Sequence, residues 1–142
     1  MSRGLVAKAS VSIRASADKV WDAFTRPEII EQYMFGTNVV SDWTEGSSIV
    51  WKSEWQGRGY EDKGVILKLV PMHLIQYSHF SPLSGLPDKP ENYHVVTVEL
   101  SHKGKVTIVS LTQDNNDTEE VKKHSEQNWT MMLQKLKKLL EK

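Results

Sequence analysis

The order of apolar and polar residues divides the chain into a first strand, two short helices, a long β-rich centre and a final helix. Residues 4–13 mix β-branched and other apolar side chains and predict the first strand. Ser16 is a suitable N-cap for a short helix whose apolar face holds Trp21 and Phe24 at helical spacing. Pro27 fits the first position of a second helix, where no amide hydrogen is needed.

The centre of the chain, up to about residue 115, has a β pattern throughout. Short turns separate most consecutive strands, which is typical of an antiparallel meander. One connection, residues 81–92, is longer and contains three prolines and a glycine, and long loops of this kind are often functional. The predicted strands are residues 37–41, 48–56, 60–70, 74–80, 93–102 and 105–113.

The last segment, residues 117–142, has the pattern of a long amphipathic helix. Asp117 and Glu120 have the spacing of a capping box and predict the start of this helix. An apolar stripe must be buried against another surface, and the predicted meander is the only surface large enough. The stripe consists of Trp129, Met132, Leu133, Leu136, Leu139 and Leu140. The predicted fold class is therefore α+β, with the helix packed on the sheet.

Length and composition exclude several classes of protein. With 142 residues, the chain is expected to form a single domain, residues 1–142. Eighteen basic and eighteen acidic residues cancel, so no overall field favours nucleic acid or an anionic membrane as a partner. The absence of cysteine excludes disulfides and thiolate metal sites. No signal peptide or long apolar run is present, which predicts a cytoplasmic protein.

Several segments resemble, in the same order along the chain, the START-like or SRPBCC superfamily. Within it, they are most similar to the family named after the C-terminal domain of the activator of the heat-shock protein 90 ATPase. No single segment is specific, but the order of all of them is. The segments are ASADKVWDAFTRPEIIEQY at residues 15–33, GVI at 64–66 with LIQYS at 74–78, VTIVSLTQ at 106–113, and the Asn128-Trp129 pair of the last helix.

This resemblance implies the helix-grip fold. In that fold a curved antiparallel sheet, here of about six to seven strands, wraps around the long C-terminal helix, with two short helices after the first strand. It also implies a cavity between sheet and helix. Tyr33, Ser47 and Asn128 depart from residues that are common in the family, which argues against carrying over a specific ligand. The eukaryotic co-chaperones have a separate N-terminal chaperone-binding domain that this sequence does not encode, so a chaperone partner is poorly supported.

Strand alternation suggests which residues face the implied cavity. Trp51, Ser53 and Trp55 share one face of their strand, opposite the charged Lys52 and Glu54, and are expected to point inward. Tyr77 and His79 share a face of another strand, although the pattern leaves open whether that face is the inner one. The expected cavity residues are Trp51, Ser53, Trp55, Tyr77, His79, Val96, Val98, Trp129, Met132, Leu133 and Leu136. The alternative is that these residues form an ordinary filled core.

Motifs for catalysis and metal binding are absent from the sequence. The five histidines lack metal-ligand spacing, and no nucleophile motif or glycine-rich phosphate loop occurs. His79 and His94 are expected to approach each other across a hairpin. The carboxylates of Glu61 and Asp62 are interpreted as structural or surface groups. We therefore expect no catalytic residues, no metal and no cofactor.

These observations lead to one hypothesis and two alternatives. The hypothesis is a protein that binds a hydrophobic or aromatic small molecule between the sheet and the C-terminal helix. The first alternative is a co-chaperone-like protein interaction module. The second is an enzyme of the cyclase or aromatase kind, which would need polar groups with shifted pKa values inside the cavity.

Overall fold

The computed structural model describes residues 4–34, 36–55 and 57–141, without the side chain of Trp55. Each of the predicted helices and strands is present, and the chain has the α+β helix-grip arrangement. The long loop contains two short 3₁₀ turns, η1 (Pro82–Ser84) and η2 (Pro90–Asn92). The other elements are β1 (Leu5–Ile13), α1 (Ala17–Thr25), α2 (Pro27–Tyr33), β2 (Asn38–Ser41), β3 (Ser48–Trp55), β4 (Arg58–Val70), β5 (Leu74–His79), β6 (His94–Lys103), β7 (Val106–Asn116) and α3 (Glu119–Leu140).

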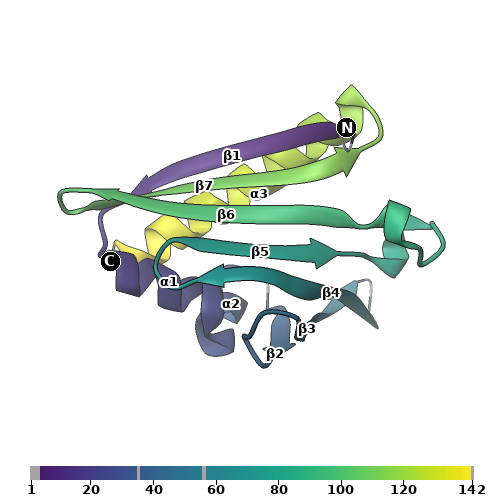
Figure 1. The fold of residues 1–142 in the computed structure, drawn as a ribbon, viewed down its shortest axis with the longest axis horizontal. Coiled ribbons are helices and arrows are strands. Elements are labelled where there is room, and N and C mark those ends of the chain that lie inside the picture. The colour runs from purple at the N-terminus through teal and green to yellow at the C-terminus, as the bar shows by residue number, and fades with distance from the viewer. Residues whose placement is uncertain (1–3, 35, 56, 142) are drawn as a thin grey trace.

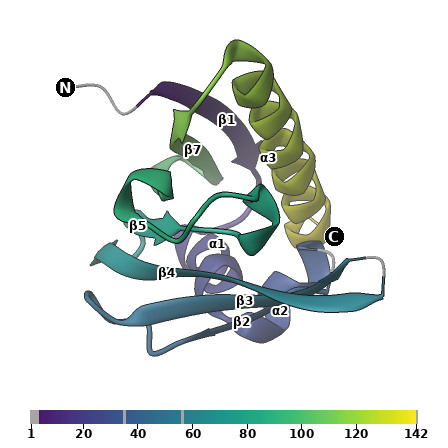
Figure 2. The same cartoon turned by 90° about the vertical axis from the view of Figure 1, so that its right-hand side faces the viewer.

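The strands form a seven-stranded sheet in the order β1-β7-β6-β5-β4-β3-β2, and every neighbouring pair is antiparallel. Figure 1 shows α3 crossing one face of this sheet, with α1 and α2 near the C-terminal end of α3. In Figure 2 the sheet is seen to curve, so that β1 and β7 lie at one end, β2 to β4 at the other, and α3 closes the concave side.

The two short helices form a unit because of the residues at their junction. Arg26 is extended (φ −108°, ψ 116°), as expected for a residue before proline, and this ends α1 before Pro27 starts α2. The hydroxyl of Tyr33 donates a hydrogen bond to the carbonyl oxygen of Ala23, which ties the end of α2 to α1. Burial raises the pKa of Tyr33, so this hydroxyl remains a donor at every physiological pH.

The start of α3 differs from the sequence prediction by one residue. The N-cap is Thr118, whose hydroxyl accepts a hydrogen bond from the amide of Val121 at 3.1 Å, so the proposed Asp117 cap is wrong. The reason lies in the preceding strand. Asn116 is buried and donates hydrogen bonds to the carbonyl oxygens of Leu5 (2.8 Å) and Gln113 (2.9 Å), which keeps residue 116 paired with β1 as the end of β7.

The core lies between the concave face of the sheet and α3. Leu133 and Leu136 of α3 are fully buried, and they belong to one cluster with Val96 of β6 and Val109 of β7. The apolar stripe of the last helix therefore packs on the sheet, as its spacing predicts. None of the described helices combines the length and the apolar character that a membrane span requires.

Candidate functional site

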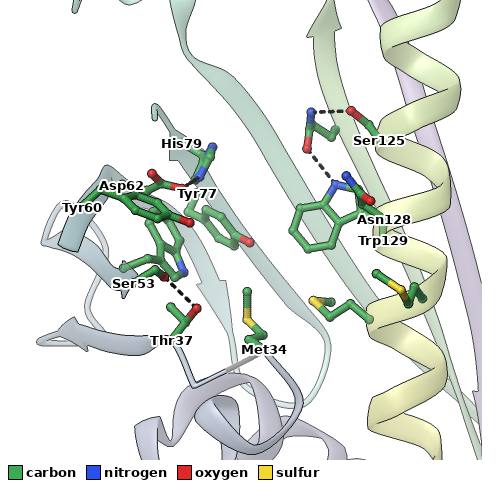
Figure 3. A pocket seen from close by; sticks show the side chains of 14 residues that line it. Met34, Thr37, Ser53, Tyr60, Asp62, Tyr77, His79, Ser125, Asn128 and Trp129 are labelled. Atoms are coloured by element: carbon green, nitrogen blue, oxygen red, sulfur yellow. Dashed lines mark hydrogen bonds and ion pairs between the residues drawn. The ribbon is translucent and has the colours of Figure 1, made fainter. Parts of the chain in front are cut away.

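A cavity of about 450 Å³ lies between the middle of α3, from Ser125 to Met132, and strands β3, β4 and β5 (Figure 3). Its floor and rim include Met34 and Thr37, which come from the connection between α2 and β2. A smaller void of about 30 Å³ adjoins it and shares several of its lining side chains. The strands supply one wall and the helix supplies the opposite wall.

Alternation along three neighbouring strands builds the sheet wall. Because antiparallel register places Trp51 opposite Asp62 and Ser53 opposite Tyr60, side chains of β3 and β4 project from adjacent positions on the same face. Tyr77 lies on β5, further along the same concave face. The wall consists of Trp51, Ser53, Tyr60, Asp62, Tyr77 and His79.

Trp51 is the centre of an aromatic group on this wall. Its ring centroid lies 5.1 Å from that of Tyr77 and 5.0 Å from that of His79. Desolvation raises the pKa of Tyr77, so its phenol stays neutral and faces the cavity as a hydrogen-bonding hydroxyl. These rings give the cavity a wall that is mainly apolar.

Asp62 and His79 form a polar pair at one end of the cavity. Nε2 of His79 lies 2.9 Å from Oδ2 of Asp62, and only 18% of the Asp62 side chain is exposed. Among the described residues, nothing donates a hydrogen bond to the buried Oδ1 of Asp62. His79 also approaches His94, its partner on β6, with ring centroids 6.3 Å apart, which confirms the predicted approach of these two histidines.

The helix wall is held in place by a network of hydrogen bonds to β7. The indole Nε1–H of Trp129 donates to Oε1 of Gln113 at 2.7 Å, and Nε2 of Gln113 donates to the hydroxyl of Ser125 at 3.4 Å. Across the cavity, the hydroxyls of Thr37 and Ser53 bond to each other at 2.8 Å. These hydrogen bonds fix the positions of the groups and so shape the cavity, and in the Thr37–Ser53 pair one of the two hydroxyls keeps its own O–H as a donor.

The structure separates the eleven predicted cavity residues into groups. Val98 lines the small adjoining void rather than the main cavity. Val96, Leu133 and Leu136 are instead buried in the core, because neighbouring side chains cover them on the concave face. The side chain of Trp55 lies outside the described part of the structure. Those that line the main cavity are Trp51, Ser53, Tyr77, His79, Trp129 and Met132.

Sequence reasoning missed several lining residues, and some of them had a signal. Tyr60 and Asp62 alternate with Ile66 on one face of β4, and Gln113 continues the inward face of Leu111 on β7. On α3 the polar residues that line the cavity lie one turn before the apolar ones. The missed residues are Met34, Thr37, Tyr60, Asp62, Gln113, Ser125, Asn128 and Met131.

Among the described residues, no three His, Asp or Glu side chains are placed to hold a metal ion. His94 lies beside His79 and is held in place by β7. Its Nδ1–H donates to the carbonyl oxygen of Asp114 at 2.8 Å.

Comparison with known proteins places this chain in a family. The sequence matches the family described as "Activator of Hsp90 ATPase homolog 1-like protein" over residues 14–141. The chain belongs to this family. A comparison with curated proteins gave no match.

Solved structures agree with this assignment. The solution structure of ChR145 from Cytophaga hutchinsonii is 59% identical, with a TM-score of 0.88 and coverage of 99% of this chain and 97% of that chain. The Aha1 dimer from Colwellia psychrerythraea has 22% identity, a TM-score of 0.76 and coverage of 96% of both chains. DynU16, a protein in the dynemicin biosynthetic locus, has 18% identity and a TM-score of 0.79, with coverage of 96% of this chain and 47% of that chain. The last two show a shared fold.

Proposed function

We propose that this family member binds an apolar or aromatic small molecule in the cavity between β3–β5 and α3. The observation that carries the proposal is the cavity itself, whose volume of about 450 Å³ is within the roughly 300–1,000 Å³ of small-molecule sites. Aromatic rings and thioethers with a few polar groups are the usual lining of such sites. Met34 and Met132 line it with flexible side chains that adapt to the shape of a ligand.

The test is a titration of ¹⁵N-labelled protein with two neutral probes, 3-ethylindole and ethylbenzene. The indole N–H signals of Trp51 and Trp129 are expected to shift, because both rings line the cavity. Trp21 lines neither the cavity nor the adjoining void and serves as the internal control. If no probe moves the signals of Trp51 and Trp129 more than that of Trp21, the binding proposal fails.

A pair of variants on one helix tests the location of binding. Ser125→Trp places a large ring at a half-buried position that lines the cavity, whereas Thr130→Trp adds the same ring at an exposed position of α3. The first variant is expected to weaken probe binding about tenfold or more, because the ring occupies space that the probe needs. Thr130→Trp is expected to bind as the wild type does. Equal binding by both variants would place the probe elsewhere.

A co-chaperone-like role is the second candidate, favoured by the family's description and by the shared fold with the Colwellia psychrerythraea Aha1. It would use the outside of the protein, where the exposed apolar side chains of Val40, Val65 and Leu67 lie on β2 and β4. The ATPase rate of heat-shock protein 90, measured with wild type and Ser125→Trp, separates the two candidates. A co-chaperone changes this rate whether or not the cavity is blocked.

A further inference from the structure

The cavity has an uneven balance of charge. Asp62 is a carboxylate on its wall, and among the described lining residues there is no lysine or arginine to balance it. His79 is the only hydrogen-bond partner that the described residues offer the carboxylate, and it engages Oδ2 alone. Burying a carboxylate with incomplete pairing is costly, so a positive group beside it would be stabilised.

The aromatic residues of the cavity add to this preference. The faces of tryptophan and tyrosine rings are electron-rich and attract a cation within about 6 Å of the ring centroid. Trp51 lies directly opposite Asp62 in the register of β3 and β4, so its indole and the carboxylate occupy neighbouring positions. Figure 3 shows Tyr60 and Tyr77 near Asp62, with Trp129 on the opposite side of the cavity on α3.

We infer that the ligand class is an organic ammonium compound, that is, an apolar or aromatic body carrying one amine or quaternary ammonium group. This inference rests on the proposed binding function and names the chemistry of the same cavity. The ammonium group is placed near Asp62 and the rings of Trp51 and Tyr60, and the apolar body extends toward Met132 and Trp129. Each contact is made by a residue that lines the cavity.

The other two charge classes fit less well. A carboxylate or phosphate ligand would place a second negative charge near Asp62, and repulsion between like charges in a partly desolvated site opposes binding. A neutral ligand avoids this repulsion but leaves the carboxylate with His79 as its single partner among the described residues. A cation both compensates the charge and contacts the aromatic faces, so it is expected to bind most tightly.

Three probes that share one ring system test the inference on the wild-type protein. They are tryptamine, which is cationic, 3-ethylindole, which is neutral, and indole-3-propionate, which is anionic. Calorimetry at physiological salt gives each dissociation constant, and the indole signals of Trp51 and Trp129 report the site. Tryptamine is expected to bind about tenfold more tightly than 3-ethylindole, and indole-3-propionate more weakly than both.

Two near-isosteric variants on one strand assign the preference to a residue. Asp62→Asn removes the charge that faces the cavity, and Glu61→Gln removes the same charge from the exposed, opposite face of β4. Asp62→Asn is expected to bring the ratio of tryptamine to 3-ethylindole affinity close to one. Glu61→Gln is expected to keep the wild-type ratio, because its charge is outside the cavity and screened by salt.

The outcomes separate this inference from the proposed function. If 3-ethylindole binds at Trp51 and Trp129 but tryptamine binds no more tightly, the ammonium inference is wrong and the binding function stands. If none of the three probes binds, both are wrong. A tryptamine preference that persists in Asp62→Asn, or that falls equally in Glu61→Gln, would also overturn the inference. The wild-type comparison decides the first question even if Asp62→Asn does not fold.

Discussion

At the scale of single residues, the Asp62–His79 pair depends on a glycine two positions further along β4. A Cβ atom built on Gly64 would lie 1.7 Å from the carbonyl oxygen of Ser78, the residue before His79. No side chain fits into that distance, so only glycine allows the backbones of β4 and β5 to come this close. This close approach is what brings His79 within 2.9 Å of Asp62.

Replacing Gly64 with alanine is therefore expected to destabilise the protein by at least about 2 kcal/mol, because β4 and β5 must move apart. Urea unfolding measures the change. Gly59→Ala is the matched control on the same strand, since its nearest atom would be 3.9 Å away. The control is expected to stay within about 0.5 kcal/mol of wild type. If the two variants lose the same amount of stability, the close approach of β4 and β5 at Gly64 is not the cause of the loss.

Residue positions were predicted from the sequence where alternation alone decides them. Trp51 and Ser53 lie on the concave face as expected, and Glu54 on the opposite face is exposed. The sequence predicts only a structural or surface role for the carboxylate of Asp62. Its place opposite Trp51 depends on the register between β3 and β4, which the pattern along a single strand does not give. Alternation indicates which face a side chain occupies and gives no information about depth, so core and cavity residues could not be told apart.

At the scale of elements, the end of α3 is tied to β1 through one carboxylate. Oε2 of Glu141 accepts hydrogen bonds from the backbone amide of Arg14 at 2.8 Å and from Nζ of Lys137 at 2.9 Å. These hydrogen bonds lower the pKa of Glu141 below its ordinary value of 4.5, and the bond from the Arg14 amide has the largest effect. The same lysine donates to the carbonyl oxygen of Ser12 at 2.6 Å, which adds a second link between this end of the helix and β1.

A lowered pKa in the folded state means that ionised Glu141 stabilises the fold. This stabilisation is complete above the ordinary value of 4.5 and is lost as the pH falls through the lower pKa of the folded protein. Glu141→Gln is expected to unfold at lower urea concentration than wild type at neutral pH, and the difference should disappear in acid. The exposed Glu54→Gln serves as the control. A difference that persists unchanged in acid would contradict this account.

The elements themselves were predicted well, because each has a strong pattern or stop signal. Pro27 separates the two short helices, and the stripe through Leu133 and Leu136 indicates the long one. The ends of the elements were predicted less accurately than their presence. Strand β7 extends to Asn116 rather than residue 113, because the Asn116 side chain bonds to Leu5 on the neighbouring strand. A bond between residues 111 positions apart leaves no local pattern in the sequence.

At the scale of the whole molecule, one helix both completes the core and bounds the cavity. The side chains of Leu133 and Leu136 on α3 are fully buried against the sheet, whereas Ser125, Asn128 and Trp129 line the cavity. The sequence indicated that this helix covers the sheet. It did not indicate where along the helix close packing gives way to open space, because that depends on side chains from four different strands and on the α2–β2 connection.

Because the core is shared by α3 and the sheet, the two are expected to unfold together. Leu133→Ala removes a fully buried side chain and is expected to cost about 2–5 kcal/mol. Far-UV circular dichroism reports mainly the helix, and tryptophan fluorescence also reports β3, so both midpoints should shift by the same amount. Met131→Ala, two positions earlier and 48% exposed, is expected to change stability by less than about 0.5 kcal/mol. If the helical signal were lost at lower urea concentration than the fluorescence signal, α3 would be a separable lid, and the cavity would open without unfolding of the sheet.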